Sequence, residues 1–221
     1  MSDIPFEFTT TAMARPNLLD STYQSFTSNL KGIDFRQSTV YINVDPIERF
    51  PDSPALQQQC IQVAQKYFGR VVSNCPISPS FPAAVKWCWS QATADWIFHL
   101  EDDWLLKKPI EIKTLLALRT HKYQVPLRAY RNNLYHRIVL SPSLLSDVVY
   151  KKAAQLLPLD KNPEHALREL CDLNRIPWKT RMPMAYPRNK NLVIITDIGR
   201  PWVHLHGIVR PAGPGFTRWQ Q

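Results

Sequence analysis

The first half of the chain alternates short apolar runs with amphipathic stretches. Four apolar or β-branched runs predict strands, at residues 6–11, 38–44, 70–73 and 96–100. Three stretches between them have helical spacing, at residues 17–30, 55–68 and 83–94. Strands that alternate with helices predict an α/β fold with a mostly parallel central sheet. The strand, loop and helix at the start are typical of the first half of a nucleotide-binding unit.

The second half of the chain is less regular, with proline at many turns. The pattern predicts helices at residues 112–119, 142–157 and 163–174, and extended segments at 125–130, 137–140 and 192–196. Asn162 is suited to cap the last of these helices, and Pro163 suits its first turn. With 221 residues, 44% of them hydrophobic, we expect one domain over 1–221, with halves at 1–104 and 105–221.

Three consecutive carboxylates, Glu101, Asp102 and Asp103, follow the strand predicted at 96–100. Like charges repel one another, so their grouping at the carboxyl end of a parallel strand favours a bound divalent cation. Oxygen ligands suit Mg²⁺ or Mn²⁺, and a metal held by one or two carboxylates completes its shell with substrate phosphates and water. The alternative is a solvated acidic turn.

This acidic run, its preceding strand and the order of elements resemble the GT-A glycosyltransferases, whose hallmark is a DxD-type motif with EDD as a common variant. The resemblance implies that Asp103 ligates a Mn²⁺ or Mg²⁺ that bridges the donor diphosphate. It also implies that Glu101 and Asp102 contact the ribose or a metal-bound water. The donor is then a nucleoside-diphosphate sugar, with uridine diphosphate as the default. Residues 1–104 become the donor-binding half and 105–221 the acceptor-binding half.

The same resemblance gives roles to residues of the first two strands. In the family, the first strand and the loop after it hold the base and ribose, which here implies Thr9, Thr10, Thr11 and Arg15. Asp45 ends the second strand, where the family often has an acidic residue for the base. Each has an ordinary alternative, because threonine is common in strands and an aspartate before proline is a common turn.

Two histidines and two arginines near the C-terminus are further candidates. Many GT-A enzymes supply a late histidine as a metal ligand, and alternation along an extended segment puts His204 and His206 on one face. A structural role for these histidines is the alternative. The tail that contains Arg210 and Arg218 resembles the mobile loop that closes on the diphosphate in the family. The two arginines would then neutralise the leaving group. A disordered terminus is the alternative there.

Glycosyl transfer by an inverting enzyme needs a base for the acceptor hydroxyl. Glu164 is the candidate, because inverting relatives carry an acidic residue at the N-terminus of a helix in this part of the chain. The sequence departs from the family at His165, which stands where a second acidic residue is usual. Favourable charge on the helix dipole is the alternative role for Glu164, and retaining chemistry stays open.

Charge and composition add hypotheses about the acceptor. The net charge of +9 attracts polyanions, and aromatic and basic residues alternate at 130–131, 135–137 and 178–181, as on surfaces that stack bases and bind phosphates. In size and charge the sequence resembles bacteriophage glycosyltransferases that modify hydroxymethyl pyrimidines in double-stranded DNA, which implies an extruded base. Glycosyltransferases of bacterial surface polysaccharide or glycolipid synthesis share the donor module. A non-catalytic nucleic-acid-binding protein is the alternative of another class.

Several classes of protein are disfavoured by what the sequence lacks. No apolar stretch approaches the roughly 20 residues that cross a membrane, and no signal-peptide pattern opens the chain, so we expect a cytoplasmic protein, in the host cytoplasm if a bacteriophage encodes it. The four cysteines have no zinc-site spacing and are expected to be buried thiols. The absence of a GxxxxGK[ST] loop, together with carboxylates in a single run, argues against a phosphoryl or nucleotidyl transferase.

Overall fold

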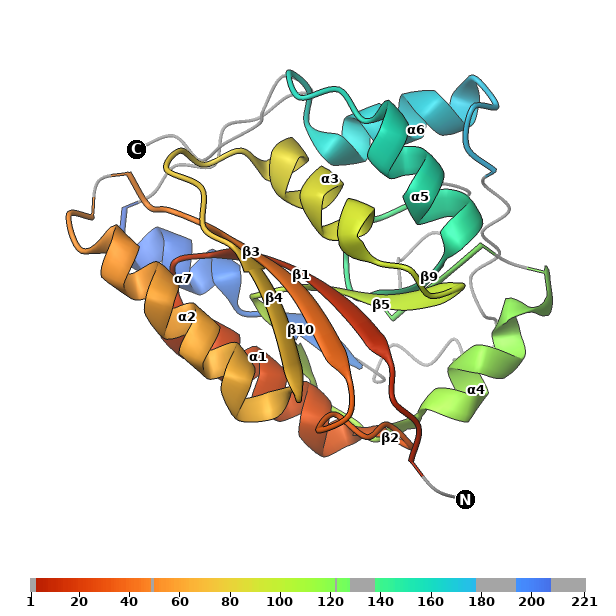
Figure 1. The fold of residues 1–221 in the computed structure, drawn as a ribbon, viewed down its shortest axis with the longest axis horizontal. Helices are drawn as coiled ribbons and strands as arrows, with labels where there is room; N and C mark the ends of the chain where they lie inside the picture. Colours follow the sequence, from red (N-terminus) through yellow and green to blue (C-terminus); the bar gives the residue numbers. More distant parts are fainter. Residues whose placement is uncertain (1–2, 49, 122, 128–137, 178–193, 208–221) are drawn as a thin grey trace.

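The chain forms three layers, in which a six-stranded sheet lies between two groups of helices (Figure 1). The computed structural model describes residues 3–48, 50–121, 123–127, 138–177 and 194–207. The order of strands across the sheet is β4-β3-β1-β5-β9-β8. These strands are β1 (Glu7–Met13), β3 (Thr39–Asp45), β4 (Arg70–Asn74), β5 (Trp96–Glu101), β8 (Gln124–Pro126) and β9 (Ser143–Ser146). The first four run parallel and β9 is antiparallel to both of its neighbours, which confirms the predicted mostly parallel α/β sheet.

Helices cover both faces of the central sheet (Figure 1). On one side lie α1 (Pro16–Asn29) and α2 (Ser53–Tyr67), and on the other α3 (Phe81–Gln91), α5 (Asp147–Leu156) and α6 (Pro163–Asp172). Side chains alternate along each strand, so Phe98 packs against Phe26 of α1 while Ile97 joins Trp89 of α3 in the opposite core. Burial on both faces explains why the central strands are continuous apolar runs in the sequence.

Proline or a capping side chain marks the first turn of several helices. Four of them carry proline at the first or second position, namely α1, α2, α3 and α6. Proline suits this position because the first N–H groups of a helix have no partner within it. The Asn162 side chain accepts hydrogen bonds from the backbone N–H groups of Glu164 and His165 at 3.0 and 3.4 Å, which confirms the predicted cap of α6. Within the described residues, no helix combines the length and the apolar character needed to span a membrane.

Two smaller sheets attach later parts of the chain to the central layers. In one, β6 pairs antiparallel with β10, and in the other β2 pairs parallel with β7. The elements concerned are β2 (Leu30–Lys31), β6 (Trp104–Leu106), β7 (Ile110–Glu111), β10 (Ile195–Asp197), and the helices α4 (Ile112–Ala117) and α7 (Gly199–Leu205) that follow β7 and β10. The β6–β10 pair brings α7 beside the acidic run that ends β5.

The helix predicted over 142–157 is wrong in its first part. Residues 143–146 form β9, and only α5 is helical. Leu144 and Leu145 are both fully buried because they point into the cores on opposite sides of the sheet. A short apolar run that is buried on all sides has no hydrophobic period that distinguishes a strand from a helix. Residues 143–146 form a strand because they pair with β5 and β8.

The segment predicted as extended over 137–140 belongs to no strand in its described part, residues 138–140. The Val139 N–H donates to Gln124 Oε1 at 3.0 Å, and the Val139 carbonyl accepts a hydrogen bond from the same side-chain amide. A buried glutamine therefore satisfies the backbone groups that a neighbouring strand would otherwise pair.

Candidate active site

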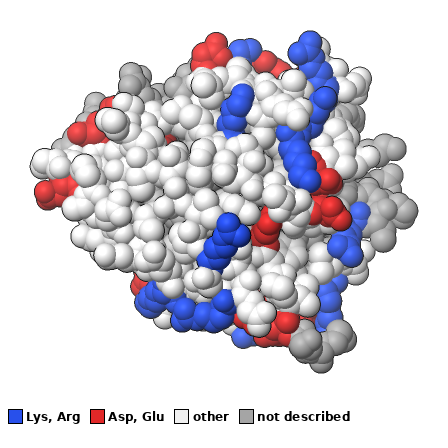
Figure 2. Space-filling model, in the orientation of Figure 1, with Lys and Arg blue, Asp and Glu red and all other residues white. Residues whose placement is uncertain are grey.

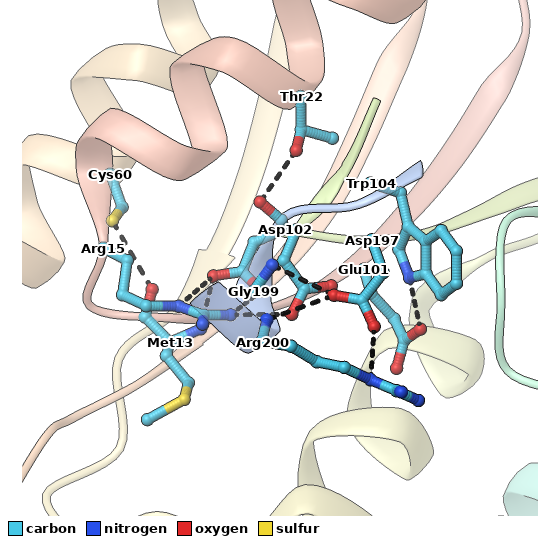
Figure 3. A network of polar contacts seen from close by, with 11 residues as sticks. Met13, Arg15, Thr22, Cys60, Glu101, Asp102, Trp104, Asp197, Gly199 and Arg200 are labelled. Carbon is cyan, nitrogen blue, oxygen red and sulfur yellow. Dashed lines mark hydrogen bonds and ion pairs between the residues drawn. The ribbon is translucent and has the colours of Figure 1, made fainter. Parts of the chain in front are cut away.

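The acidic run lies at the carboxyl edge of the central sheet, beside β1 (Figure 3). Thr11 of β1 stands opposite Glu101 in the parallel register, and the Asp102 N–H donates to the Thr11 carbonyl at 3.2 Å. The Thr22 hydroxyl of α1 donates to the Asp102 carbonyl at 2.8 Å. The run therefore stands at the edge where open α/β sheets bind their ligands.

The middle carboxylate, Asp102, forms a buried ion pair with Arg15. Nε and Nη2 of Arg15 donate to the two carboxylate oxygens at 3.0 and 2.6 Å, and the side chains are only 2% and 4% exposed. The Met13 N–H donates to Asp102 Oδ2 at 3.2 Å. Burial alone would lower the pKa of Arg15, but the charges of Asp102 and Asp103 raise it above its ordinary value. Asp102 and Arg15 thus hold the loop after β1, and neither Asp102 oxygen is left unpaired for a ribose.

The last carboxylate, Asp103, has a different environment. Its Oδ2 accepts a longer hydrogen bond from Arg15 Nη2 at 3.2 Å, and its side chain is 19% exposed. Burial and the charges of Asp102 and Asp197 together raise the pKa of Asp103 to about 6, although Arg15 opposes the shift. No hydrogen bond reaches Asp103 Oδ1 from any of the residues that the structure describes. Asp103 therefore carries negative charge that its neighbours do not fully balance.

The first carboxylate of the run, Glu101, interacts electrostatically with Glu164 of α6. Burial raises the pKa of Glu101 well above its ordinary value, and the charges of Asp103 and Glu164 raise it further. Trp104 Nε1 donates to Glu101 Oε2 at 2.9 Å, which opposes this shift. Glu164 stands in the first turn of α6, and its Oε1 accepts from the Leu140 N–H at 3.5 Å. Glu164, the predicted base, thus acts electrostatically on Glu101, and its own side chain is tied to the Leu140 backbone.

A second polar group lies at the carboxyl ends of β3 and β4. Asp45 accepts hydrogen bonds from Asn43 Nδ2 at 2.7 Å and from the Ser80 N–H at 3.1 Å, and burial raises the pKa of Asp45 to about 6. Asn74 Nδ2 donates to Asn43 Oδ1 at 2.6 Å. Sequence reasoning found Asp45 but missed both asparagines. The signal available was that each asparagine comes near the end of its strand, where parallel strands meet at one edge.

Comparison with known proteins extends these observations. No known family model and no characterised protein sequence matches the chain. Among solved structures, the mannosyltransferase PcManGT from Pyrobaculum calidifontis, in complex with GDP-Man and Mn²⁺, aligns with a TM-score of 0.51 at 9% identity, over 75% of this chain and 52% of that one. This chain has a GT-A-type fold. It spans about half the length of the mannosyltransferase that it matches.

Two other solved structures, one of them named as a glycosyltransferase, give lower TM-scores. Residues 1–349 of S. aureus TarS, in complex with UDP-GlcNAc, give a TM-score of 0.47 at 11% identity, over 75% of this chain and 53% of that one. The apo form of GlyE from Streptococcus pneumoniae gives 0.42 at 16% identity, over 77% and 38% of the two chains.

The carboxylates of this GT-A-type fold do not form a complete protein cage for a metal, but they fit a metal that takes part of its ligands from a substrate. Among the described residues, no three His, Cys, Asp or Glu side chains form a preformed metal cage. Asp103 instead offers Oδ1, which receives no hydrogen bond from the described residues. Burial and neighbouring carboxylates raise the pKa values of Asp103 and Glu101, and a cation beside them would lower these values. A Mg²⁺ or Mn²⁺ bound by one or two carboxylates takes its other ligands from phosphates and water. The residues therefore fit a metal that binds together with a diphosphate.

The threonines of β1 occupy two different environments. Thr9 contacts His99 Nδ1 at 3.0 Å, and Thr10 accepts from the Tyr23 hydroxyl at 3.0 Å. Both lie within the sheet, and burial lowers the pKa of His99 to about 3, so this histidine is neutral. Only Thr11 stands at the carboxyl edge, beside Glu101, and its buried hydroxyl has no partner among the described residues. The edge position makes Thr11 the best placed of the three to meet a donor.

The prediction that His204 and His206 share a face of an extended segment is wrong, because this part of the chain is α7 and its C-terminal turn. Residues two apart on a helix point about 200° apart. His204 is exposed, whereas His206 stacks on Trp202 with ring centroids 4.0 Å apart. Trp202 in turn lies 5.1 Å from the Arg15 guanidinium.

Sequence reasoning missed Asp197, the carboxylate that this segment brings to the site. Asp197 ends β10, opposite Trp104 of β6, and its charge raises the pKa of Asp103. No local pattern signals this contact, because it depends on pairing between distant segments. The predicted residues Arg210 and Arg218, and the aromatic and basic segments 130–131, 135–137 and 178–181, lie outside the described residues.

Proposed function

We propose that the protein is a metal-dependent glycosyltransferase that moves a sugar from a nucleoside-diphosphate sugar to a hydroxyl acceptor. The observation that carries the proposal is the grouping of Glu101 and Asp103 at the carboxyl edge of a GT-A-type sheet, where burial and neighbouring carboxylates raise both pKa values. A solvated acidic turn would not bury these groups together. A site that receives a cation with a diphosphate explains why they are held there.

Each residue at the edge has a role in this proposal. Asp103 would hold the metal through its unpaired oxygen, with Glu101 beside it. A bound Mn²⁺ or Mg²⁺ supplies positive charge that stabilises the departing diphosphate. Asp45, which Asn43 orients, would accept an N–H of the nucleobase, and Thr11 would contact the donor nearby. Arg15 keeps Asp102 neutralised and so fixes the loop under the donor.

Glu164 is the proposed base for an inverting reaction. Its place in the first turn of α6, within the field of Glu101, puts it at the same edge as the donor site and on a different element. The Glu164 carboxylate would take the proton of the acceptor hydroxyl as that oxygen attacks the sugar. An inverting outcome would support this assignment, and a retaining outcome would remove it.

The identities of donor and acceptor are finer predictions. GDP-Man and UDP-GlcNAc in the aligned structures make both nucleotides worth testing, with UDP as the default from sequence. Hydroxymethyl pyrimidine in bacteriophage DNA remains the predicted acceptor, with bacterial polysaccharide or glycolipid as the alternative. On the face drawn in Figure 2, lysine and arginine are interspersed with aspartate and glutamate and form no continuous basic track among the described residues. The prediction of a DNA acceptor thus rests on the net charge and on the aromatic and basic segments 130–131, 135–137 and 178–181.

A thermal-shift panel tests the proposal. UDP, GDP, UDP-GlcNAc and GDP-Man are each added with Mn²⁺, with Mg²⁺ or with chelator, because a ligand of the folded state raises the melting temperature. We expect a metal-dependent rise with one nucleotide, and its loss in Asp103→Ala. Asp20→Ala is the matched control, since Asp20 is a carboxylate of α1 that pairs with Lys66 away from the site. A metal-dependent rise that survives in Asp103→Ala would contradict the proposal.

A further inference from the structure

The start of α7 packs directly against Asp103. A Cβ atom added at Gly199 would lie 2.0 Å from Asp103 Oδ2, 2.7 Å from Cγ and 2.8 Å from Cβ. Distances this short are incompatible with any side chain at position 199 in the present arrangement. The φ of Gly199 is not in the left-handed region, so the requirement for glycine here comes from the close approach and not from the backbone conformation.

Three contacts hold Gly199 in this place. The Ile198 N–H donates to the Asp103 carbonyl at 2.8 Å. The Asp197 side chain accepts from the N–H groups of Gly199 and Arg200 at 3.0 and 3.2 Å, which fixes the first turn of α7 (Figure 3). Antiparallel pairing of β10 with β6 then fastens this turn to the residues that follow the acidic run. The approach of Gly199 to Asp103 is therefore built into the fold.

The two oxygens of Asp103 are consequently unequal. Oδ2 is packed between Arg15 Nη2, at 3.2 Å, and the α-carbon region of Gly199. Oδ1 receives no hydrogen bond from the described residues. A carboxylate that is free to rotate would exchange its two oxygens, whereas this one is wedged against a backbone and a buried guanidinium.

We propose that Gly199 is a positioning residue that wedges the Asp103 carboxylate so that Oδ1 alone would be available to a bound metal. This inference rests on the proposed function, because it concerns the same metal. It adds a residue from the far end of the described chain, acting through packing and with no contact to the metal itself. It also explains why the segment after β10 carries glycine directly against the acidic site.

The expected consequence is a loss of metal affinity when the wedge is altered. A methyl group at position 199 has to be relieved chiefly by moving the Asp103 side chain, since all three close contacts are to that side chain. Loss of a group that orients a ligand typically lowers metal affinity by roughly 10–100-fold. We expect an increase of this size in the Mn²⁺ concentration that gives half of the thermal shift in Gly199→Ala.

Val203→Ala is the matched control for a merely structural effect. Val203 is a buried apolar residue one turn further along the same helix, so its truncation loosens the packing of α7 without placing an atom against the Asp103 carboxylate. Each full-length variant is titrated with Mn²⁺ at a fixed concentration of the stabilising nucleotide diphosphate, and its shift is referred to its own melting temperature in chelator. Val203→Ala should melt at a lower temperature and keep its half-saturating Mn²⁺ concentration within about twofold of wild type.

The outcomes separate the two proposals. A weaker Mn²⁺ response in Gly199→Ala than in Val203→Ala supports the positioning role. Equal half-saturation in Gly199→Ala and wild type overturns it, while a lost response in Asp103→Ala would leave the proposed function intact. Equal weakening in Gly199→Ala and Val203→Ala also overturns it, because the effect is then general loosening of α7. No Mn²⁺ response in wild type with any nucleotide overturns both proposals.

Discussion

Two sides of the acidic edge balance their negative charge differently. On the side of β1, Asp102 is enclosed with Arg15 in a pair that leaves neither carboxylate oxygen unpaired. On the side of α6 and α7, burial and neighbouring charges raise the pKa values of Glu101 and Asp103. Three consecutive carboxylates thus contain one that is neutralised by a buried arginine and two whose charged forms are disfavoured in the absence of a ligand. Consecutive residues acquire different roles because each side chain enters a different tertiary environment.

The largest expected effect is on activity in Asp103→Ala. Removal of the proposed ligand forfeits several kcal/mol of stabilisation of the departing diphosphate, so we expect the metal-dependent transfer or donor hydrolysis to fall by about 10³-fold. The melting temperature in chelator should not fall, because the charged form of Asp103 is disfavoured in the folded state at neutral pH. Initial rates and thermal melts check both statements. Full activity in Asp103→Ala would contradict the proposal that Asp103 binds the metal whereas Asp102 is structural.

The next effect is on stability in Asp102→Ala. Removal of one partner from a buried ion pair leaves the other charge uncompensated, and this typically costs about 3–5 kcal/mol of unfolding free energy. The contact of Arg15 with Asp103 should place the loss near the lower end of that range. Urea unfolding measures it, with Lys161→Ala as control, because the ion pair of Lys161 with Glu169 is exposed and its removal should change stability little. Similar losses in both variants would refute the structural role of Asp102.

A smaller effect is expected from pH on the metal-free protein. The pKa values of Asp103 and Asp45 are raised to about 6 in the folded state, above the roughly 3.9 of an unfolded aspartate. The charged forms therefore destabilise the fold above about pH 6, and this penalty is relieved as the pH falls towards 4. In chelator, Asp103→Asn should be more stable than wild type at pH 7.5, by on the order of 1–2 kcal/mol. The difference should shrink by pH 4.5, and a constant difference in urea unfolding would contradict the assigned shift.

The smallest effect is expected from the late histidines. His204 is exposed and His206 stacks on Trp202, so neither is expected to act as the metal ligand that the sequence suggested. We expect His204→Ala to change the half-saturating Mn²⁺ concentration by less than about twofold, measured by thermal shift. A tenfold change would show that the side of the site formed by α7 includes this histidine.

Local pattern was enough to predict most of the first half of the chain. The four parallel strands and the helices between them follow from runs and periods that neighbouring residues impose on one another, and the acidic run was located correctly at the end of β5. Asn162 was also predictable as a cap, because the cap and the N–H groups that it serves are two and three residues apart.

The errors share a different physical origin. Residues 143–146 are a strand because β5 and β8 pair with them, and residues 199–205 are a helix beginning at a turn capped by Asp197 and docked on Asp103. In both cases the local pattern is compatible with two structures, and contacts with distant segments select one.

The sequence by itself determined the α/β class and the position of three consecutive carboxylates at the carboxyl end of a buried strand. Only the tertiary structure decided which carboxylate is neutralised, because Arg15 and Asp102 are 87 residues apart in the chain. It also decided that Asp197 and Gly199 lie beside Asp103, and that His204 and His206 do not share one face of an extended segment. Charge balance and close packing depend on which atoms meet in space, and that information is carried by strand pairing and not by local spacing.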